Sequence, residues 1–391
     1  MTYSKETELL HRPKVKLPEG NEPMVMPIYQ TAKFTFPSWA ELLENHDKKT
    51  GFFYSRTSNP TVRQLENQVA ALQGRDDCVA LASGMAAVTT ALLALLKAGD
   101  HVAFAYESYR PARSFVRDTL SRWGITSSLF SVRDPDALQA LMSTKKPAVV
   151  MFEAPSNPVN HVPDIAVLTE IIHRHGALCL LDNTLGGLHV FGEYDVDIFI
   201  HSLTKFAGGH SDVMGGAIVG NDDVIAPIKA LAPILGPMMD PHAAFLILRG
   251  LETYFLRFRH QCATSQAVAE FLEGHEAVRK VHYPGLPGHP SHALCMQQAE
   301  SFGAVVSFDI NGGLREAESF VDRLKLFYVS GSLGSVHSLV VPAQPLFASD
   351  YDEQTAEMVG VVPGTVRLCI GLESADDLIS DLAQALNGEG A

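Results

Sequence analysis

The chain has 391 residues, of which 46% are apolar and 19% charged, and its formal net charge is −14. This length allows two or three domains with a large core, and the negative charge argues against nucleic acid and acidic membrane surfaces as partners. Five scattered cysteines without metal-ligand spacing predict a reducing compartment, no disulfide framework and no structural zinc. The N-terminus lacks the apolar stretch of a signal peptide, so we expect a cytoplasmic protein.

The first 58 residues predict an extended N-terminal arm. Prolines at positions 13, 18, 23, 27 and 37 exclude long helices and leave one short helix near residues 38–46. Such an arm cannot bury its own apolar side chains. We therefore expect it to wrap around a second subunit.

From residue 59 onward, helical and strand patterns alternate. Helices are expected at residues 62–72, 83–99, 113–123, 134–142 and 165–175. Short apolar strands are expected at residues 78–81, 101–105, 148–152, 177–181, 197–201 and 216–219. Short buried strands separated by helices indicate an α/β fold with a mostly parallel sheet covered on both faces.

The second half of the chain predicts a bridge and a smaller domain. Residues 243–272 read as one long helical region with a break around 257–260. Beyond it we expect strands at 305–310, 326–329 and 365–370, and helices at 314–323 and 375–386. The predicted organisation is thus an arm (1–58), a large domain (59–257) and a C-terminal α/β domain (258–391).

Polar residues follow two of the predicted strands, at the sheet edge where ligands of doubly wound folds bind. Ser83, Gly84 and Met85 stand where a strand gives way to a helix, which suits a phosphate because the helix offers free N–H groups there. The alternative is an ordinary helix N-cap. Asp182 ends another apolar strand, and either it pairs with a buried cation or it caps the next turn.

A third strand leads to the stretch DVDIFIHSLTKFAGGHSDVMGG, residues 195–216. Lys205 lies here at the mouth of a buried strand, beside the hydroxyls of Ser202 and Thr204 and before a glycine-rich turn. A lone lysine is ordinarily a solvated surface charge. In this place, however, it suits an amine that loses its proton and condenses with an aldehyde. The three strand ends together predict that Lys205 holds pyridoxal phosphate as a Schiff base.

Motifs along nearly the whole chain resemble one family, the pyridoxal-phosphate enzymes of Cys/Met metabolism (cystathionine γ-synthase, cystathionine γ- and β-lyases and methionine γ-lyase). The matching motifs are PIYQT (27–31), FYSRTSNPT (53–61), LASGMAAV (81–88), GDHV (99–102), EAPSNP (153–158), DNT (182–184), HSLTKFAGGHSD (201–212), HYPGLP (282–287), SLG (332–334) and VRLCIGLES (366–374). The resemblance implies a type I PLP-dependent transferase fold, like that of aspartate aminotransferase, and a homotetramer of two catalytic dimers.

The resemblance also implies a role for each matching residue. It makes Lys205 the Schiff-base lysine and proton shuttle, and Tyr109 the residue that stacks on the cofactor ring and serves in acid–base steps. Asp182 pairs with the pyridinium nitrogen. The implied phosphate site consists of Ser83, Gly84, Met85, Ser202 and Thr204, with Tyr54 and Arg56 from the neighbouring subunit. The implied substrate site consists of Asn157, Ser332 and Arg367, of which the last two clamp the α-carboxylate.

The sequence departs from the family where the far end of the substrate should lie. Phe53 and His337 stand where glutamates are common, and Ser114 replaces a common arginine, while Arg110 and Arg113 add charge nearby. These changes make cystathionine an unsuitable substrate, because its distal amine and carboxylate lose their partners. We interpret Phe53 and His337 as substrate contacts, with the alternatives that Phe53 only packs and that His337 is a hydrogen-bonded wall residue.

The predicted function is that of a trans-sulfuration-type lyase or γ-synthase. We expect γ-elimination, or else γ-replacement, on an L-homoserine-type amino acid with a sulfur or oxygen substituent, including acylated homoserines and canavanine-like compounds. Elimination would give 2-oxobutanoate and ammonia. The alternatives are a cystathionine or cysteine-conjugate β-lyase and, from another class, a catalytically idle PLP-binding regulatory protein.

Overall fold

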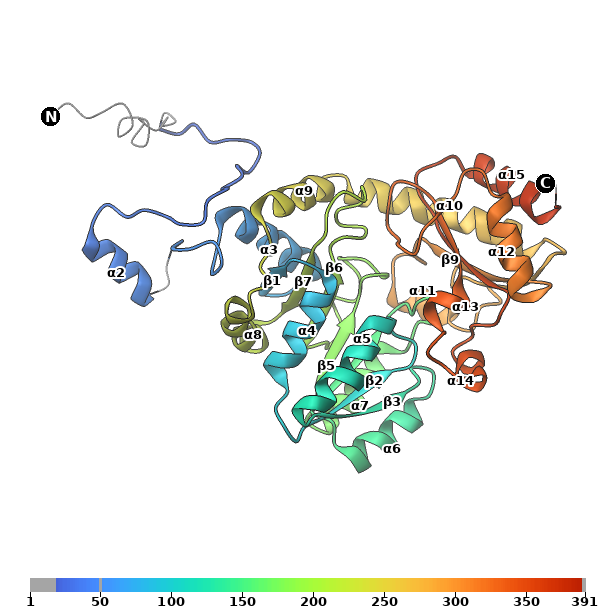
Figure 1. The fold of residues 1–391 in the computed structure, drawn as a ribbon, viewed down its shortest axis with the longest axis horizontal. Coiled ribbons are helices and arrows are strands. Elements are labelled where there is room, and N and C mark those ends of the chain that lie inside the picture. Colours follow the sequence, from blue (N-terminus) through green and yellow to red (C-terminus); the bar gives the residue numbers. More distant parts are fainter. Residues whose placement is uncertain (1–18, 49–50, 389–391) are drawn as a thin grey trace.

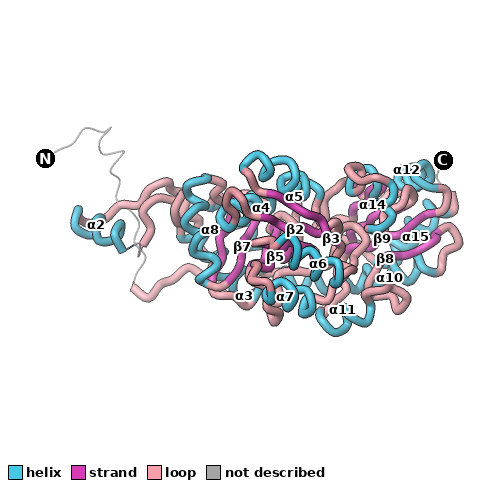
Figure 2. Tube along the Cα trace, turned by 90° about the horizontal axis from the view of Figure 1, so that it is seen from below, coloured by secondary structure: helices cyan, strands magenta, loops and turns pink. Residues whose placement is uncertain are grey.

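The computed structural model describes residues 19–48 and 51–388, which form an arm and two sheets with their helices (Figure 1). The arm carries α2 (Trp39–Lys48), which has no buried residue. Two views at right angles both show the arm leading away from the rest of the molecule (Figures 1 and 2). The arm therefore leaves its apolar side chains without cover from its own chain, as expected; Met24, Ile28 and Tyr29 are all exposed.

The larger sheet has seven strands in the order β1-β7-β6-β5-β4-β2-β3. Their bounds are β1 Asp77–Leu81, β2 His101–Ala105, β3 Thr126–Phe130, β4 Val149–Glu153, β5 Leu178–Asp182, β6 Ile198–Ser202 and β7 Gly216–Gly220. Only β7 runs against its neighbours β1 and β6, because the loop 203–215 rather than a helical crossover joins it to β6. The sheet is thus mostly parallel, as predicted.

Two hydrophobic layers cover the two faces of this sheet, and alternate residues of each strand point into opposite layers. In β4, Val150 and Phe152 pack on one side, while Val149 and Met151 pack on the other. The first layer contains α3 (Pro60–Gln73), α6 (Pro135–Lys145) and α7 (Ile165–Arg174). The second contains α4 (Gly84–Leu95) and α8 (Asp222–Leu235).

The structure corrects three predicted elements. The single helix predicted at 113–123 is α5 (Arg110–Ser114) followed by a π-helical turn (Phe115–Thr119) and a 3₁₀ turn (Leu120–Trp123). Helix α8 was missed because Pro227 and Pro233 lie inside it. The break expected at 257–260 lies instead between α9 (Pro241–Leu251) and α10 (Tyr254–Glu273).

Arg257 shows why α10 continues through the predicted break. Its guanidinium is buried and bonded to backbone oxygens. It donates to the carbonyl oxygens of Gly250 at 2.7 Å and of Phe206 at 3.0 Å, and its Nε donates to Thr253. Arg257 thereby satisfies the exposed carbonyl end of α9 from within α10, and α10 continues unbroken.

The second sheet has five strands in the order β10-β11-β12-β9-β8. Their bounds are β8 Val278–His282, β9 Val305–Ile310, β10 Tyr328–Val329, β11 Leu339–Pro342 and β12 Thr365–Cys369. Its helices are α11 (His292–Gln298), α12 (Gly313–Arg323), α13 (Ala343–Phe347), α14 (Glu353–Met358) and α15 (Ala375–Leu386). Helix α10 runs from the first sheet to the second (Figure 1). The domain boundary predicted at 257/258 falls within α10, and the division into domains stays a prediction.

No helix in residues 19–48 and 51–388 combines the length and the apolar character needed to cross a bilayer.

Candidate active site

The three strand ends singled out in the sequence surround one cavity of about 370 Å³. Its lining is drawn from both halves of the chain and consists of Ser83, Gly84, Met85, Val88, Tyr109, Glu153, Asn157, Asp182, Thr184, Leu185, Ser202, Thr204, Lys205, Gly331, Leu333, Phe347 and Arg367. Parallel strands bring their carboxyl ends to one edge of the sheet, and for this reason β4, β5 and β6 deliver Glu153, Asp182 and Ser202 to the same place. The second sheet supplies Arg367 from β12.

One end of the cavity is a turn suited to an anion. Ser83 is the N-cap of α4, and its hydroxyl accepts the N–H of Ala86 at 3.1 Å. The N–H groups of Gly84 and Met85 have no acceptor among the described residues. A Cβ at Gly84 would lie 2.9 Å from the Cβ of Ser202, so only glycine lets strand β6 approach the helix end this closely.

The lysine loop is held in place by backbone contacts and by Thr204. The hydroxyl of Thr204 accepts the N–H of Gly215 at 3.0 Å, which ties the loop to the start of β7. The N–H of Lys205 donates to the carbonyl oxygen of Ser202 at 3.2 Å. The side chain of Lys205 extends to the other wall, where Nζ donates to the hydroxyl of Ser332 at 2.9 Å.

The environment of Lys205 favours the neutral amine. Burial lowers the pKa of Lys205, and the positive charge of Arg367 lowers it further. No carboxylate lies within ion-pair distance of Nζ among the described residues. The amine is therefore prepared to act as a nucleophile and as a base, which are the two functions predicted for it.

Asp182 is a carboxylate that has no cationic partner among the described residues. It accepts the N–H of Thr184 at 3.1 Å, and no lysine, arginine or histidine of the described ranges pairs with it. Burial raises the pKa of Asp182 above its usual range. A carboxylate enclosed in this way without a partner is costly, and a bound group with an N–H⁺ would relieve that cost.

Arg367 is the corresponding buried cation. It is 1% exposed, and it donates to the Oδ1 of Asn157 at 3.1 Å and to the carbonyl oxygens of Gly331 and Ser332. The described residues offer it no carboxylate, and its Nε has no acceptor. Burial lowers the pKa of Arg367 to about 10. The site therefore presents a guanidinium that an anionic ligand such as a carboxylate would satisfy.

Tyr109 lies between the cavity and its mouth. It is the N-cap residue of α5, and its backbone N–H donates to the carboxylate of Glu153. Burial raises the pKa of Tyr109, and the charges of Glu153 and Asp182 raise it further, so the phenol keeps its proton. Glu153 was not singled out in the sequence, although it ends a buried strand and begins the EAPSNP motif, which are the same signals that identified Asp182.

Five of the predicted site residues do not line this cavity in their own chain; one of them, Ser332, still contacts the site because its hydroxyl accepts the hydrogen bond from Lys205. Tyr54 and Arg56 are on the arm, where the Arg56 guanidinium donates to the carbonyl oxygen of Pro233 at 2.9 Å. Phe53 is 39% exposed and lies near Phe36 and His46. His337 is exposed, and its ring meets that of Tyr328 edge-on at 5.4 Å between centroids.

The lining residues fit pyridoxal phosphate. The free N–H groups at Gly84 and Met85 suit its phosphate, and the unpaired carboxylate of Asp182 suits a protonated ring nitrogen. The buried amine of Lys205 suits its aldehyde. Arg367 then remains free for the carboxylate of an amino acid.

Comparisons with known proteins agree with this fit. Residues 6–387 match the model of the Cys/Met metabolism PLP-dependent enzyme family. The chain is 37% identical over 370 residues to L-methionine gamma-lyase of Pseudomonas putida (93% of this chain, 92% of the relative). It is also 37% identical over 366 residues to cystathionine gamma-synthase 1, chloroplastic, of Nicotiana tabacum (92% of this chain, 67% of the relative).

A solved structure of a putative O-acetylhomoserine (thiol)-lyase from Campylobacter jejuni matches with a TM-score of 0.89 and 27% identity, over 98% of this chain and 100% of that one. That structure carries N'-pyridoxyl-lysine-5'-monophosphate at its position 205. The predicted fold class and cofactor are thus confirmed. The chain belongs to the Cys/Met metabolism PLP-dependent enzyme family.

Proposed function

We propose that this PLP-dependent enzyme of Cys/Met metabolism catalyses γ-elimination, or γ-replacement, on an L-amino acid with a γ-substituent of the homoserine or homocysteine type. The observation that carries the proposal is the position of Lys205 between Asp182 and Arg367 in one cavity. An amine with a lowered pKa there can serve a substrate whose carboxylate is held by Arg367. The named activities of the relatives, methionine γ-lyase and cystathionine γ-synthase, support the same reaction class.

Each residue contributes one function to the reaction. Pyridoxal phosphate, when bound, withdraws electrons from the α-carbon of an attached amino acid. Gly84, Met85 and Ser202 would hold the phosphate, and Asp182 would keep the ring nitrogen protonated. Arg367 would bind the α-carboxylate through two parallel hydrogen bonds and so fix which face of the α-carbon meets Lys205.

Proton transfers require a base and an acid. The Nζ of Lys205 takes the α-proton and, for γ-chemistry, also a β-proton; a β-lyase would need only the first of these steps. The phenol of Tyr109 keeps its proton in this environment, so it can deliver that proton to the departing γ-substituent.

A product assay tests the proposal. The purified enzyme is given pairs of β- and γ-substituted amino acids, and the keto acids are identified. If the enzyme catalyses γ-elimination, γ-substituted compounds should give 2-oxobutanoate and ammonia. If it catalyses γ-replacement, turnover should require an added thiol nucleophile and should give a new amino acid. Pyruvate as the sole keto acid would replace the proposal with β-elimination, and a lack of turnover of every compound would favour a regulatory protein.

We further propose that the arm completes the active site of a neighbouring subunit within a homotetramer. Tyr54 and Arg56 carry phosphate-binding groups that do not reach their own cavity. A mixture of Lys205→Ala and Arg56→Ala proteins tests this, since one hybrid site would contain both intact residues. Recovered activity after mixed refolding is the expected result. No recovery with an inactive Arg56→Ala protein would place Arg56 in the site of its own subunit, and full activity of Arg56→Ala alone would place it outside the site. The cytoplasmic location expected from the sequence stays a prediction.

A further inference from the structure

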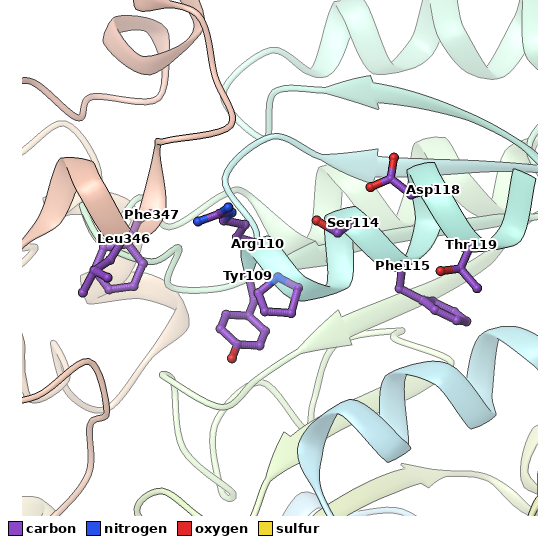
Figure 3. A pocket seen from close by; sticks show the side chains of 9 residues that line it. Tyr109, Arg110, Ser114, Phe115, Asp118, Thr119, Leu346 and Phe347 are labelled. Carbon is purple, nitrogen blue, oxygen red and sulfur yellow. The ribbon is translucent and has the colours of Figure 1, made fainter.

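A second cavity, of about 650 Å³, adjoins the first at the start of α5 (Figure 3). Its lining consists of Tyr109, Arg110, Pro111, Ser114, Phe115, Asp118, Thr119, Leu346 and Phe347. Tyr109 and Phe347 also line the cavity around Lys205, so the two spaces share a wall. The Phe347 ring lies 4.5 Å from the guanidinium of Arg367, which relates this wall to the residue that would hold the substrate carboxylate.

The charges of this cavity do not cancel. Its one acidic side chain, Asp118, is bound by Arg117 through two hydrogen bonds of 2.8 and 3.0 Å. Nearby Asp350 is bound by the buried Arg113 at 2.8 Å. Arg110 makes no hydrogen bond to a described residue, and its nearest carboxylate oxygen, of Asp350, is 3.8 Å away. Asp350 also lies 3.7 Å from Arg117, so its ion pair with Arg110 is the longest of three, and the three arginines exceed Asp118 and Asp350 by one positive charge.

The remaining lining suits an apolar chain that leads to this charge. Pro111, Phe115, Leu346 and Phe347 form apolar walls, and Ser114 adds a hydroxyl. Figure 3 shows Arg110 extending from the start of α5 toward Phe347 and Leu346 on α13. An occupant with a positive end would meet Arg110 and find Asp118 already paired with Arg117. The chemistry therefore favours a chain that ends in an anion and has no ammonium group.

We propose that the second cavity receives the γ-substituent of the substrate and that Arg110 selects substituents ending in a carboxylate. The proposal rests on the proposed function for the orientation of the amino acid, with its α-carboxylate on Arg367 and its side chain directed past Phe347. Arg110 then supplies a charge one helical turn before Ser114, where the sequence lacks the arginine common in the family. A long monoacid substituent fits this arrangement, and zwitterionic cystathionine does not.

Binding of unreactive amino acids tests the cavity without turnover. L-2-aminopimelate ends in a carboxylate and L-2-aminooctanoate in a methyl group, and neither has a γ-leaving group. Calorimetry on the cofactor-loaded enzyme should show the first binding about fivefold more tightly, the size expected for a half-exposed ion pair. Added salt should reduce that preference. Arg110→Gln should remove it, while Arg122→Gln, a neighbouring exposed arginine outside the cavity, should retain it.

Equal binding of L-2-aminopimelate and L-2-aminooctanoate by the unmodified enzyme would overturn the proposal. An equal loss of the binding preference in Arg110→Gln and Arg122→Gln would overturn it as well. Turnover provides a separate comparison. O-succinyl- and O-acetyl-L-homoserine share an ester leaving group, and Arg110→Gln should raise KM for the first about fivefold and leave the second unchanged. If neither ester yields 2-oxobutanoate, the proposed γ-chemistry fails, whereas the binding preference still reports whether Arg110 selects a carboxylate.

Discussion

The two adjoining cavities of this enzyme handle charge in opposite ways. In the cavity around Lys205, the guanidinium of Arg367 is buried, the amine of Lys205 and the carboxylate of Asp182 are partly buried, and none of the three has a partner of opposite charge among the described residues. In the cavity beside α5, the acidic groups are paired and Arg110 is half exposed. Isolated charges are expensive to bury and inexpensive to expose. The unpaired charges around Lys205 must therefore be maintained for a ligand, whereas the exposed Arg110 can change with the substrate.

Replacing Lys205 should reduce activity more than any other change in the two cavities. Lys205→Ala removes both the cofactor anchor and the base, and we expect activity to fall by about 10⁴-fold, the upper range for loss of a positioned acid–base group. Initial rates measure the change, and the absorption band of lysine-bound cofactor should vanish. Lys97→Ala, a lysine remote from both cavities, serves as the control; equal losses in both variants would contradict the role of Lys205.

Asp182→Asn should lower turnover and raise the stability of the cofactor-free protein. We expect turnover to fall by about 100-fold, as for loss of one preorganised electrostatic contact. The cofactor-free protein should become more stable near neutral pH, because burial raises the pKa of Asp182 and its charged form is then unfavourable in the folded state. Denaturant unfolding with and without cofactor measures both effects. A loss of stability in the cofactor-free state would show that Asp182 has a structural partner.

Acid should destabilise the fold through buried neutral histidines. Burial lowers the pKa of His161 and His201 to about 3 and that of His289 to about 4. Below the ordinary histidine pKa of about 6.5, the unfolded chain binds protons that the folded chain excludes, so stability falls as pH falls toward 4, by about 1.4 kcal/mol per pH unit for each fully excluded proton. Unfolding free energies measured between pH 7 and 4 should show this slope, and a flat profile would contradict it.

His337→Ala should have the smallest effect. The side chain is exposed and contacts Tyr328, so we expect a change in unfolding free energy within about 0.5 kcal/mol. In its own chain His337 lies outside both cavities, so we also expect kcat/KM to stay close to that of the unmodified enzyme. A large rise in KM alone would instead support the substrate contact interpreted from the sequence.

The sequence was most informative where local pattern and chemistry coincide. Lys205, Asp182 and Ser83 each follow a short apolar strand, and parallel strands bring such ends together, so their meeting in one cavity could be expected. The edge strand β3 was missed because its residues Thr126–Phe130 are mostly exposed and polar and lack an apolar pattern. Helix α8 was missed because two prolines lie inside it.

The residues of the wall that the two cavities share could not be predicted from sequence patterns. Phe347 lies far along the chain in the short helix α13, and only the packing of the second sheet brings it beside Tyr109 and Arg367. The sharing of Asp350 among Arg110, Arg113 and Arg117 likewise depends on side-chain geometry. Composition and spacing indicate that these charges exist but not which of them neutralise one another.

Lys205 is proposed to carry the cofactor in a cavity built from the three strand ends. Reduction of the cofactor-loaded enzyme with borohydride, followed by peptide mapping, identifies the lysine that binds it. We expect one pyridoxyl group per chain, on the peptide that contains Lys205. A label on another lysine, or no label after saturation with pyridoxal phosphate, would contradict it.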